Sequence, residues 1–191
     1  QETGSIAVTS VPEGATISLD GASTGIVTNG TLMDVPVGTH TVAVTLDGYL
    51  PASAEVMVSS GETASVHFDL ILETGNVTVT SIPEGATIAL DGVVTGIVTN
   101  GTLTDVPVGA HTVAVTLDGY LPASSPVTVS SGETASVHFD LTQETGSIAV
   151  TSVPEGATIS LDGASTGIVT NGTLVDVPVG THTVEATLEG Y

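Results

Sequence analysis

The chain has 191 residues, including 21 Asp and Glu but no Lys or Arg, which gives a formal net charge of −21. A protein without permanent cations cannot neutralise phosphates, so we expect no nucleic-acid partner and no electrostatic docking on anionic lipids. There is no run of about 18 apolar residues, so we expect no membrane span. Salt bridges can form only through the five histidines or a free amino terminus.

The remaining composition is that of a folded β protein. Apolar residues make up 40% of the chain and charged residues only 11%, whereas disordered segments combine low hydrophobicity with high charge. Ser and Thr together supply roughly a quarter of the residues. Small, β-branched and turn-forming residues therefore predict an all-β protein with a core of Val, Ile and Leu.

An internal repeat organises the sequence. The tripeptide Glu-Thr-Gly recurs with a period of 71 residues, at Glu2, Glu73 and Glu144. We predict a first repeat over residues 1–71, a second over 72–142 and a partial third over 143–191. The third lacks counterparts of the last two predicted strands, which we expect a neighbouring chain or further sequence of a longer array to supply.

In each repeat, apolar and polar residues alternate along short segments, which predicts strands, and clusters of turn-forming residues separate these segments. The apolar positions of the first repeat are Ile6 and Val8; Ile17 and Leu19; Ile26 and Val27; Leu32; Val42, Val44 and Leu46; Val56 and Val58; and Val66, Phe68 and Leu70. Seven short strands in about 70 residues predict a small antiparallel β-sandwich of Ig-like or prealbumin-like type. The pair Asn29-Gly30 predicts a tight hairpin between the third and fourth strands.

A Pro-Glu-Gly-Ala motif follows the first predicted strand of every repeat. It occupies Pro12, Glu13, Gly14 and Ala15; Pro83, Glu84, Gly85 and Ala86; and Pro154, Glu155, Gly156 and Ala157. The residues on either side of the motif also match in all three repeats. On this basis the chain resembles PEGA domain proteins along its whole length. The resemblance implies small β-sandwiches in tandem, as in archaeal and bacterial surface-layer-like and other envelope proteins. It implies no enzymatic activity and carries no catalytic residues.

The asparagines raise the question of glycosylation. All four lie in Asn-x-Thr sequons, at Asn29, Asn76, Asn100 and Asn171. N-linked glycan at these positions would require an extracytoplasmic route. The hairpin turn accounts equally well for Asn29, Asn100 and Asn171 without sugar, so both interpretations stay open.

No residue pattern indicates a cofactor or a catalytic site. The five histidines have no local partner at metal-ligand spacing. We expect them to be polar residues beside a Val-Pro-Val-Gly turn or on the outward face of the last strand, namely His40, His111 and His182 or His67 and His138. Carboxylates from adjoining Asp-Gly turns leave surface-bound calcium as an alternative. No nucleophile elbow is present, so we expect a protein that is not an enzyme.

The near-identical repeats favour a structural role. We predict a secreted or cell-surface tandem-repeat polymer that forms an extracellular filament, stalk or surface layer, which makes a homo-oligomer the expected assembly. An adhesin or spacer that binds glycan or another envelope protein is the alternative. An accessory domain of a larger enzyme is a third candidate.

One local change in the second repeat suggests a contact surface. Val93 and Val94 replace Ala22 and Ser23 of the first repeat, which makes them candidates for a contact between repeats or between chains. Without Lys or Arg, contacts between chains must depend on strand pairing, apolar contacts or bridging metal ions. Such contacts should tighten when salt or acid screens the carboxylates.

Overall fold

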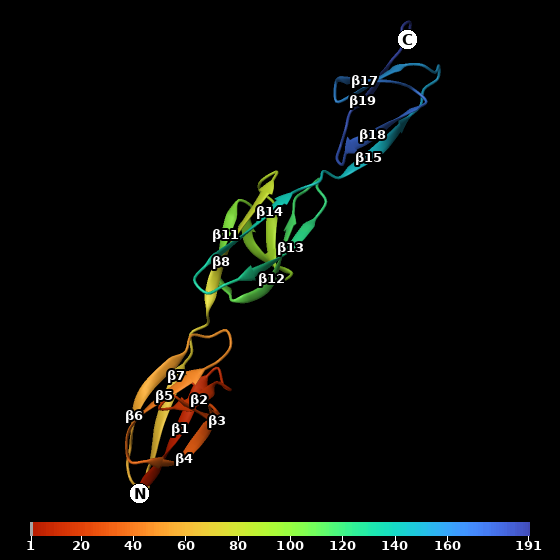
Figure 1. The fold of residues 1–191 in the computed structure, drawn as a ribbon. Helices are drawn as coiled ribbons and strands as arrows, with labels where there is room; N and C mark the ends of the chain where they lie inside the picture. The colour runs from red at the N-terminus through yellow and green to blue at the C-terminus, as the bar shows by residue number, and fades with distance from the viewer. Residues whose placement is uncertain (1) are drawn as a thin grey trace. The chain divides into compact units, whose positions relative to one another are not determined.

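The computed structural model describes residues 2–191, so Gln1, where the first predicted repeat begins, lies outside the described residues (Figure 1). Residues 2–191 form strands and no helix. The strands of the first repeat are β1 (Thr3–Val11), β2 (Thr16–Leu19), β3 (Ala22–Val27), β4 (Gly30–Pro36), β5 (Gly38–Thr45), β6 (Ala52–Val58) and β7 (Thr63–Asp69). The predicted all-β class is therefore confirmed.

The second and third repeats follow the same order of elements. The second contains β8 (Thr74–Ile82), β9 (Thr87–Leu90), β10 (Val93–Val98), β11 (Gly101–Pro107), β12 (Gly109–Thr116), β13 (Ala123–Val129) and β14 (Thr134–Asp140). The third contains β15 (Thr145–Val150), β16 (Thr158–Leu161), β17 (Ala164–Val169), β18 (Gly172–Pro178) and β19 (Val184–Thr187). These five strands are the counterparts of β1 to β5.

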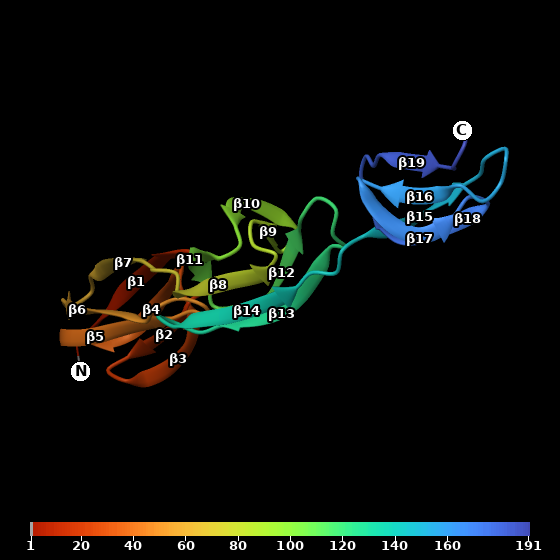
Figure 2. The same cartoon turned by 90° about the horizontal axis from the view of Figure 1, so that it is seen from above.

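Two sheets build each of the first two repeats. In the first repeat, one sheet has the order β4-β1-β7 and the other the order β3-β2-β5-β6. The second repeat has the corresponding sheets β11-β8-β14 and β10-β9-β12-β13. In the third, β15 pairs with β18, and β16 lies between β17 and β19 (Figure 2). The chain thus passes from one sheet to the other between β1 and β2, β3 and β4, β4 and β5, and β6 and β7.

In the first repeat, one strand pair departs from the predicted antiparallel arrangement. β1 pairs with β4 in antiparallel fashion, but it pairs with β7 in parallel, from Ser5 opposite Thr63 to Val11 opposite Asp69. The parallel pair arises because β7 does not return as a hairpin beside β6. The chain crosses to the other sheet after β6 and runs alongside β1 in the same direction.

The core of the first repeat lies between its two sheets. Ile6 and Val8 from β1 are fully buried, as are Val42 and Val44 from β5. Leu19 and Leu46, also predicted to face inward, are partly buried against this cluster. Met57, which lies between Val56 and Val58 on β6, has a side chain that is 65% exposed. The period-two pattern thus identified the inward faces correctly.

The third repeat has a smaller core. Its cluster of buried residues consists of Ile159, Leu174 and Val177. Ile148 and Val150, the counterparts of fully buried Ile6 and Val8, are partly exposed. In the first repeat, Ile6 and Val8 lie on the strand that pairs with β7, whose counterpart does not occur within residues 143–191.

Backbone hydrogen bonds extend into the short segment after β7. Leu70 N donates to Val11 O, and Glu73 N donates to Gly48 O. When residues are grouped by the closeness of their Cα atoms, the described chain divides into two compact units. One unit contains the residues up to Val77 together with Thr104–Ala110 and Thr128–Ala135, and the other contains the remaining residues. This division cuts through the second repeat. The strand pairs, in contrast, each stay within one predicted repeat, and the repeat boundaries themselves stay a prediction.

The Glu-Thr-Gly glycines provide a test of the packing between strands. A Cβ added to buried Gly75 would lie 2.8 Å from Glu133 O and closer still to Ser130 O, whereas one added to Gly146 would have no heavy atom of residues 2–191 within 4 Å. We expect Gly75→Ala to lower the free energy of unfolding by about 1–3 kcal/mol. Gly146→Ala, the matched control, should change it by no more than about 0.5 kcal/mol. Urea denaturation of both variants measures this difference, and equal effects would contradict it.

Candidate functional site

The Pro-Glu-Gly-Ala motif forms a corner between the two sheets. In the first repeat it joins β1 to β2, and the Val11–Pro12 peptide bond is cis. Gly14 has a φ of +88°, a left-handed conformation that glycine adopts without strain. Ala15 is fully buried. The motif's Gly and Ala thus each meet a specific steric requirement at this corner.

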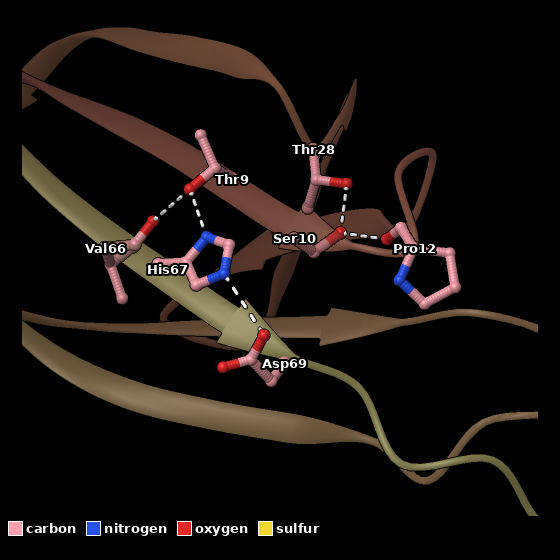
Figure 3. Close-up of polar contacts among 7 residues, drawn as sticks. All are labelled: Thr9, Ser10, Pro12, Thr28, Val66, His67 and Asp69. Atoms are coloured by element: carbon pink, nitrogen blue, oxygen red, sulfur yellow. Dashed lines mark hydrogen bonds and ion pairs between the residues drawn. The ribbon is translucent and has the colours of Figure 1, made fainter.

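A buried pair of hydroxyl groups connects this corner to the next one (Figure 3). Thr28, between β3 and β4, places its Oγ1 2.6 Å from Ser10 Oγ. Thr28 Oγ1 also accepts the backbone N–H groups of Gly14 and Ala15, each at 3.1 Å. Ser10 Oγ donates to Pro12 O, so the Thr28 hydroxyl donates to Ser10. This network satisfies each hydroxyl group and fixes both corners together.

The same hydroxyl pair occurs in the other repeats. Ser81 and Thr99 lie 2.6 Å apart, as do Ser152 and Thr170. We call each of these three pairs a corner pair. In every repeat, the Ser of the pair lies two residues before the Pro of the motif, and the Thr lies thirteen residues after its Ala. The motif is thus always accompanied by these two hydrogen-bonded residues. Sequence reasoning did not identify this partnership.

The predicted hairpin at Asn29-Gly30 is wrong. β3 pairs with β2 and β4 pairs with β1, so the segment between them is a second corner between the sheets. Asn29 adopts a φ of +66°, and its N–H donates to Val8 O. Gly30 is required for a different reason: a Cβ there would lie 2.6 Å from Ile26 Cγ2 and 2.7 Å from the carbonyl oxygen of Val27. A left-handed backbone at Asn29 and close approach at Gly30, and not a hairpin turn, account for the Asn-Gly pair.

The sequon asparagines occupy two kinds of position. Asn29, Asn100 and Asn171 are exposed at the β3–β4 corner and its counterparts. The Asn100 side chain donates to Glu84 Oε2 at 3.0 Å, and its Oδ1 accepts the N–H of Ser81. Asn76 is partly exposed on β8, the central strand of its sheet. Whether any of them carries glycan stays a prediction.

Three of the histidines form ion pairs with aspartates twenty residues earlier in the sequence. His40 Nδ1 lies 2.7 Å from Asp20 Oδ2, and its Nε2 lies 2.8 Å from Pro36 O. Asp20 Oδ1 accepts the backbone N–H of Thr41 at 2.8 Å. The pairs His111–Asp91 and His182–Asp162 have the same 2.7 Å separation. We call each His–Asp pair, with its backbone partners, a clasp.

The clasp favours the charged form of both partners, the carboxylate of Asp and the imidazolium of His. The hydrogen bond from His40 lowers the pKa of Asp20 below its ordinary value, with help from the N–H of Thr41. The hydrogen bond to Asp20 raises the pKa of His40, and the Pro36 carbonyl adds to the effect. The pKa of Asp91 and of Asp162 is lowered and that of His182 is raised, each first by its partner in the clasp.

The sequence prediction for these histidines was incomplete. It placed them beside the Val-Pro-Val-Gly turn, where they lie, but it assigned them no partner. A fixed spacing of twenty residues between an Asp-Gly turn and a following His, present in every repeat, was the signal that could have revealed the clasp. Among residues 2–191, no three His, Asp or Glu side chains gather closely enough to hold a metal ion. Surface-bound calcium stays a prediction.

A hydroxyl, an imidazole and a carboxylate also line up on the outer face of the first repeat (Figure 3). Thr9 Oγ1 lies 2.7 Å from His67 Nδ1, and His67 Nε2 lies 3.4 Å from Asp69 Oδ1. The same three groups form a hydrolytic triad, but there Nε2 of the imidazole faces the hydroxyl and Nδ1 faces the carboxylate, the reverse of the arrangement here. The side chains of His67 and Asp69 are, however, 51% and 88% exposed, so water surrounds them. The arrangement therefore has neither the nitrogen assignment of a triad nor the enclosure that an activated nucleophile needs.

Val93 and Val94 begin β10, which is an edge strand of its sheet. Their side chains are 70% and 65% exposed. Ile97 and Val98 continue the exposed apolar surface along the same strand. Val94 lies opposite Ala89 of β9, so the apolar character extends to the neighbouring strand. The role of Val93 and Val94 as contact residues stays a prediction.

The corner pair yields a test of what the motif contributes. Thr28→Val keeps the shape of the side chain but leaves the buried N–H of Ala15 and the partly buried N–H of Gly14 without their acceptor. We expect it to lower the free energy of unfolding of the first repeat by about 2–3 kcal/mol. Hydrogen exchange of the β1 amides measures this, with the β8 amides as an internal reference. Thr16→Val, which removes an exposed hydroxyl bonded to Thr45, should cost no more than about 0.5 kcal/mol. A similar cost for both variants would contradict the assignment.

Comparisons with known proteins agree with this architecture. The family model for the PEGA domain matches residues 3–73, 74–145 and 145–191. No curated protein sequence matches the chain. In the described part of the chain, residues 2–191, no helix is long and apolar enough to cross a membrane.

Among solved structures, the chain is similar to the Bacillus anthracis TIE protein, with 14% identity and a TM-score of 0.54. The alignment covers 98% of this chain but only 45% of that protein. The major pilin subunit of Bacillus cereus, BcpA, aligns over 97% of this chain and 88% of its own, with 14% identity and a TM-score of 0.43. The first similarity concerns the fold alone. Because the PEGA model matches nearly the whole chain in three tandem segments, the chain belongs to the PEGA domain family.

Proposed function

We propose that the chain is a structural, non-enzymatic part of a secreted or cell-surface protein, which assembles into an extracellular filament, stalk or surface layer. The observation that carries this proposal is the repetition itself. The same corner pair and the same clasp recur in all three repeats, so the polar side chains of these pairs and clasps serve the corners of the fold. Such a design favours a repeated building block over a single reactive site.

The edge strand β10 is the surface that best suits a contact between copies. An edge strand presents unpaired backbone N–H and C=O groups to a partner strand. Residues 93–98 contain no charged side chain, although the whole chain carries a net charge of −21. The carboxylate nearest in sequence, Asp91, is paired with His111. Two copies therefore meet less electrostatic repulsion at β10 than at an acidic turn.

The valines distinguish this edge from its counterparts. The first and third repeats have Ala and Ser where the second has Val93 and Val94. Burial of two exposed valine side chains contributes to association through the hydrophobic effect, which salt does not screen. We infer that this edge is one contact through which copies assemble.

Electron microscopy and light scattering of the purified chain test the proposal. We expect ordered fibres or sheets whose axial repeat matches one or a few 71-residue units. The variant Val93→Ala/Val94→Ser, which restores the residues of the first repeat, should assemble less at equal concentration. The reverse change, Ala22→Val/Ser23→Val, should assemble more.

Two outcomes would count against this account. Dispersed chains that bind glycan would favour the adhesin or spacer. Ordered assemblies that the Val93→Ala/Val94→Ser variant forms equally well would retain the structural role but remove β10 as the contact.

A further inference from the structure

The protonation state of the clasp histidine follows from its geometry. A neutral imidazole has one N–H donor and one acceptor nitrogen, whereas an imidazolium has two donors. In the first repeat, the ring faces an acceptor at each nitrogen, the Asp20 carboxylate at 2.7 Å and the Pro36 carbonyl at 2.8 Å. Only the imidazolium can donate to both. The clasp in its observed geometry is therefore complete only when His40 is charged.

The same geometry occurs independently in the third repeat. His182 Nδ1 lies 2.7 Å from Asp162 Oδ2, and its Nε2 lies 2.6 Å from Pro178 O. In the second repeat, His111 Nδ1 lies 2.7 Å from Asp91 Oδ2. The side chains of the three histidines are only 13–16% exposed. Because the chain has no Lys or Arg, these three mostly buried rings are the groups that can place a positive charge beside the aspartates.

The clasp joins elements of both sheets. Asp20 follows β2 in one sheet, and Pro36 ends β4 in the other. At the other end of β4, Thr28 of the corner pair lies two residues before the strand and holds the corner between β1 and β2. Both ends of β4 therefore lie beside a side-chain contact at a crossing between the sheets. The corner pair contains no titratable group, whereas the clasp does.

The surroundings of His40 leave Asp20 as its titratable partner. On β6, Val56 lies opposite His40, and Glu55 lies opposite Thr41 with its side chain exposed on the outer face. On β4, Asp34 lies two residues before Pro36 and is exposed. The pKa of His40 is raised first by Asp20, then by the Pro36 carbonyl.

We propose that the three clasps form a pH-dependent fastening between the two sheets, which is closed in mildly acidic solution and opens as the solution becomes alkaline. Loss of the proton leaves one ring nitrogen facing an acceptor without a hydrogen. It also leaves Asp20, Asp91 and Asp162 without their cations, and the chain becomes three charges more negative. This inference concerns the stability of the single chain and does not depend on whether the chain assembles.

The direction of the effect follows from linkage. A group whose pKa is raised on folding contributes stability that is fully present below its unfolded value, 6.5 for His40 and His182, and that is lost as the pH rises through the folded value. The aspartates have lowered pKa values, so their contribution is present above 3.8 and is lost as the pH falls through the folded value. Stability from the clasps is therefore greatest between these two limits and declines on both sides.

The test is thermal unfolding of the whole chain from about pH 5 to about pH 9. We expect the midpoint temperature to fall on the alkaline side. The triple variant His40→Gln/His111→Gln/His182→Gln should lose most of this dependence. The matched control His67→Gln/His138→Gln removes two histidines from outer faces and should retain it. Equal pH dependence in the triple variant and the wild-type chain would overturn the proposal.

A second measurement does not require the triple variant to fold. Nitrogen NMR of the wild-type chain reports the protonation of each ring. We expect the rings of His40 and His182 to carry protons on both nitrogens, with titration midpoints above those of the same residues in the urea-unfolded chain. Midpoints equal to or below the unfolded values would contradict the proposal.

Discussion

The absence of fixed cations is the constraint on which the rest of the structure depends. With 21 carboxylates and no Lys or Arg, the folded chain cannot balance its charge by ordinary salt bridges. Apart from the three clasps, its stability must come from apolar burial, backbone pairing and hydrogen bonds between neutral groups. The fully buried Ile and Val side chains of β1 and β5 supply the first contribution. The sheets supply the second, and the Ser–Thr corner pairs belong to the third.

The two kinds of fastening on β4 show how this constraint is met. At one end, Ser10 and Thr28 satisfy two backbone N–H groups and each other without any charge. At the other end, Asp20 is held by a histidine, the one residue type in this sequence that can become a cation in mild acid. Both devices act at crossings between the sheets, where the strand ladders end and backbone groups need other partners. The motif that characterises the family thus forms one of two corners, and hydrogen bonds to Thr28 hold the two corners together.

Much of the fold could be predicted because burial in a sheet imposes a period of two. That period predicted strands with Ile6, Val42 and Val56 among their apolar positions, and all three side chains are buried. Three features could not be predicted from local pattern. Asn29-Gly30 looked like a hairpin because turn chemistry does not reveal whether the next strand stays in the same sheet. The parallel pair of β1 and β7 and the Asp20–His40 clasp depend on contacts between residues 20 or more positions apart. No local pattern encodes such contacts, and for the clasp only the constant Asp-to-His spacing across the repeats could have indicated one.

The central claim is that the fold is stabilised by neutral interactions against a net negative charge. The most direct test is the free energy of unfolding in urea at neutral pH as sodium chloride rises from about 0.01 M to about 1 M. Over this range the Debye length falls from about 30 Å to about 3 Å. If neutral interactions hold the fold while the carboxylates repel one another, stability rises with salt. A steady loss of stability with salt would show that attractive charge pairs hold the fold and would contradict the account.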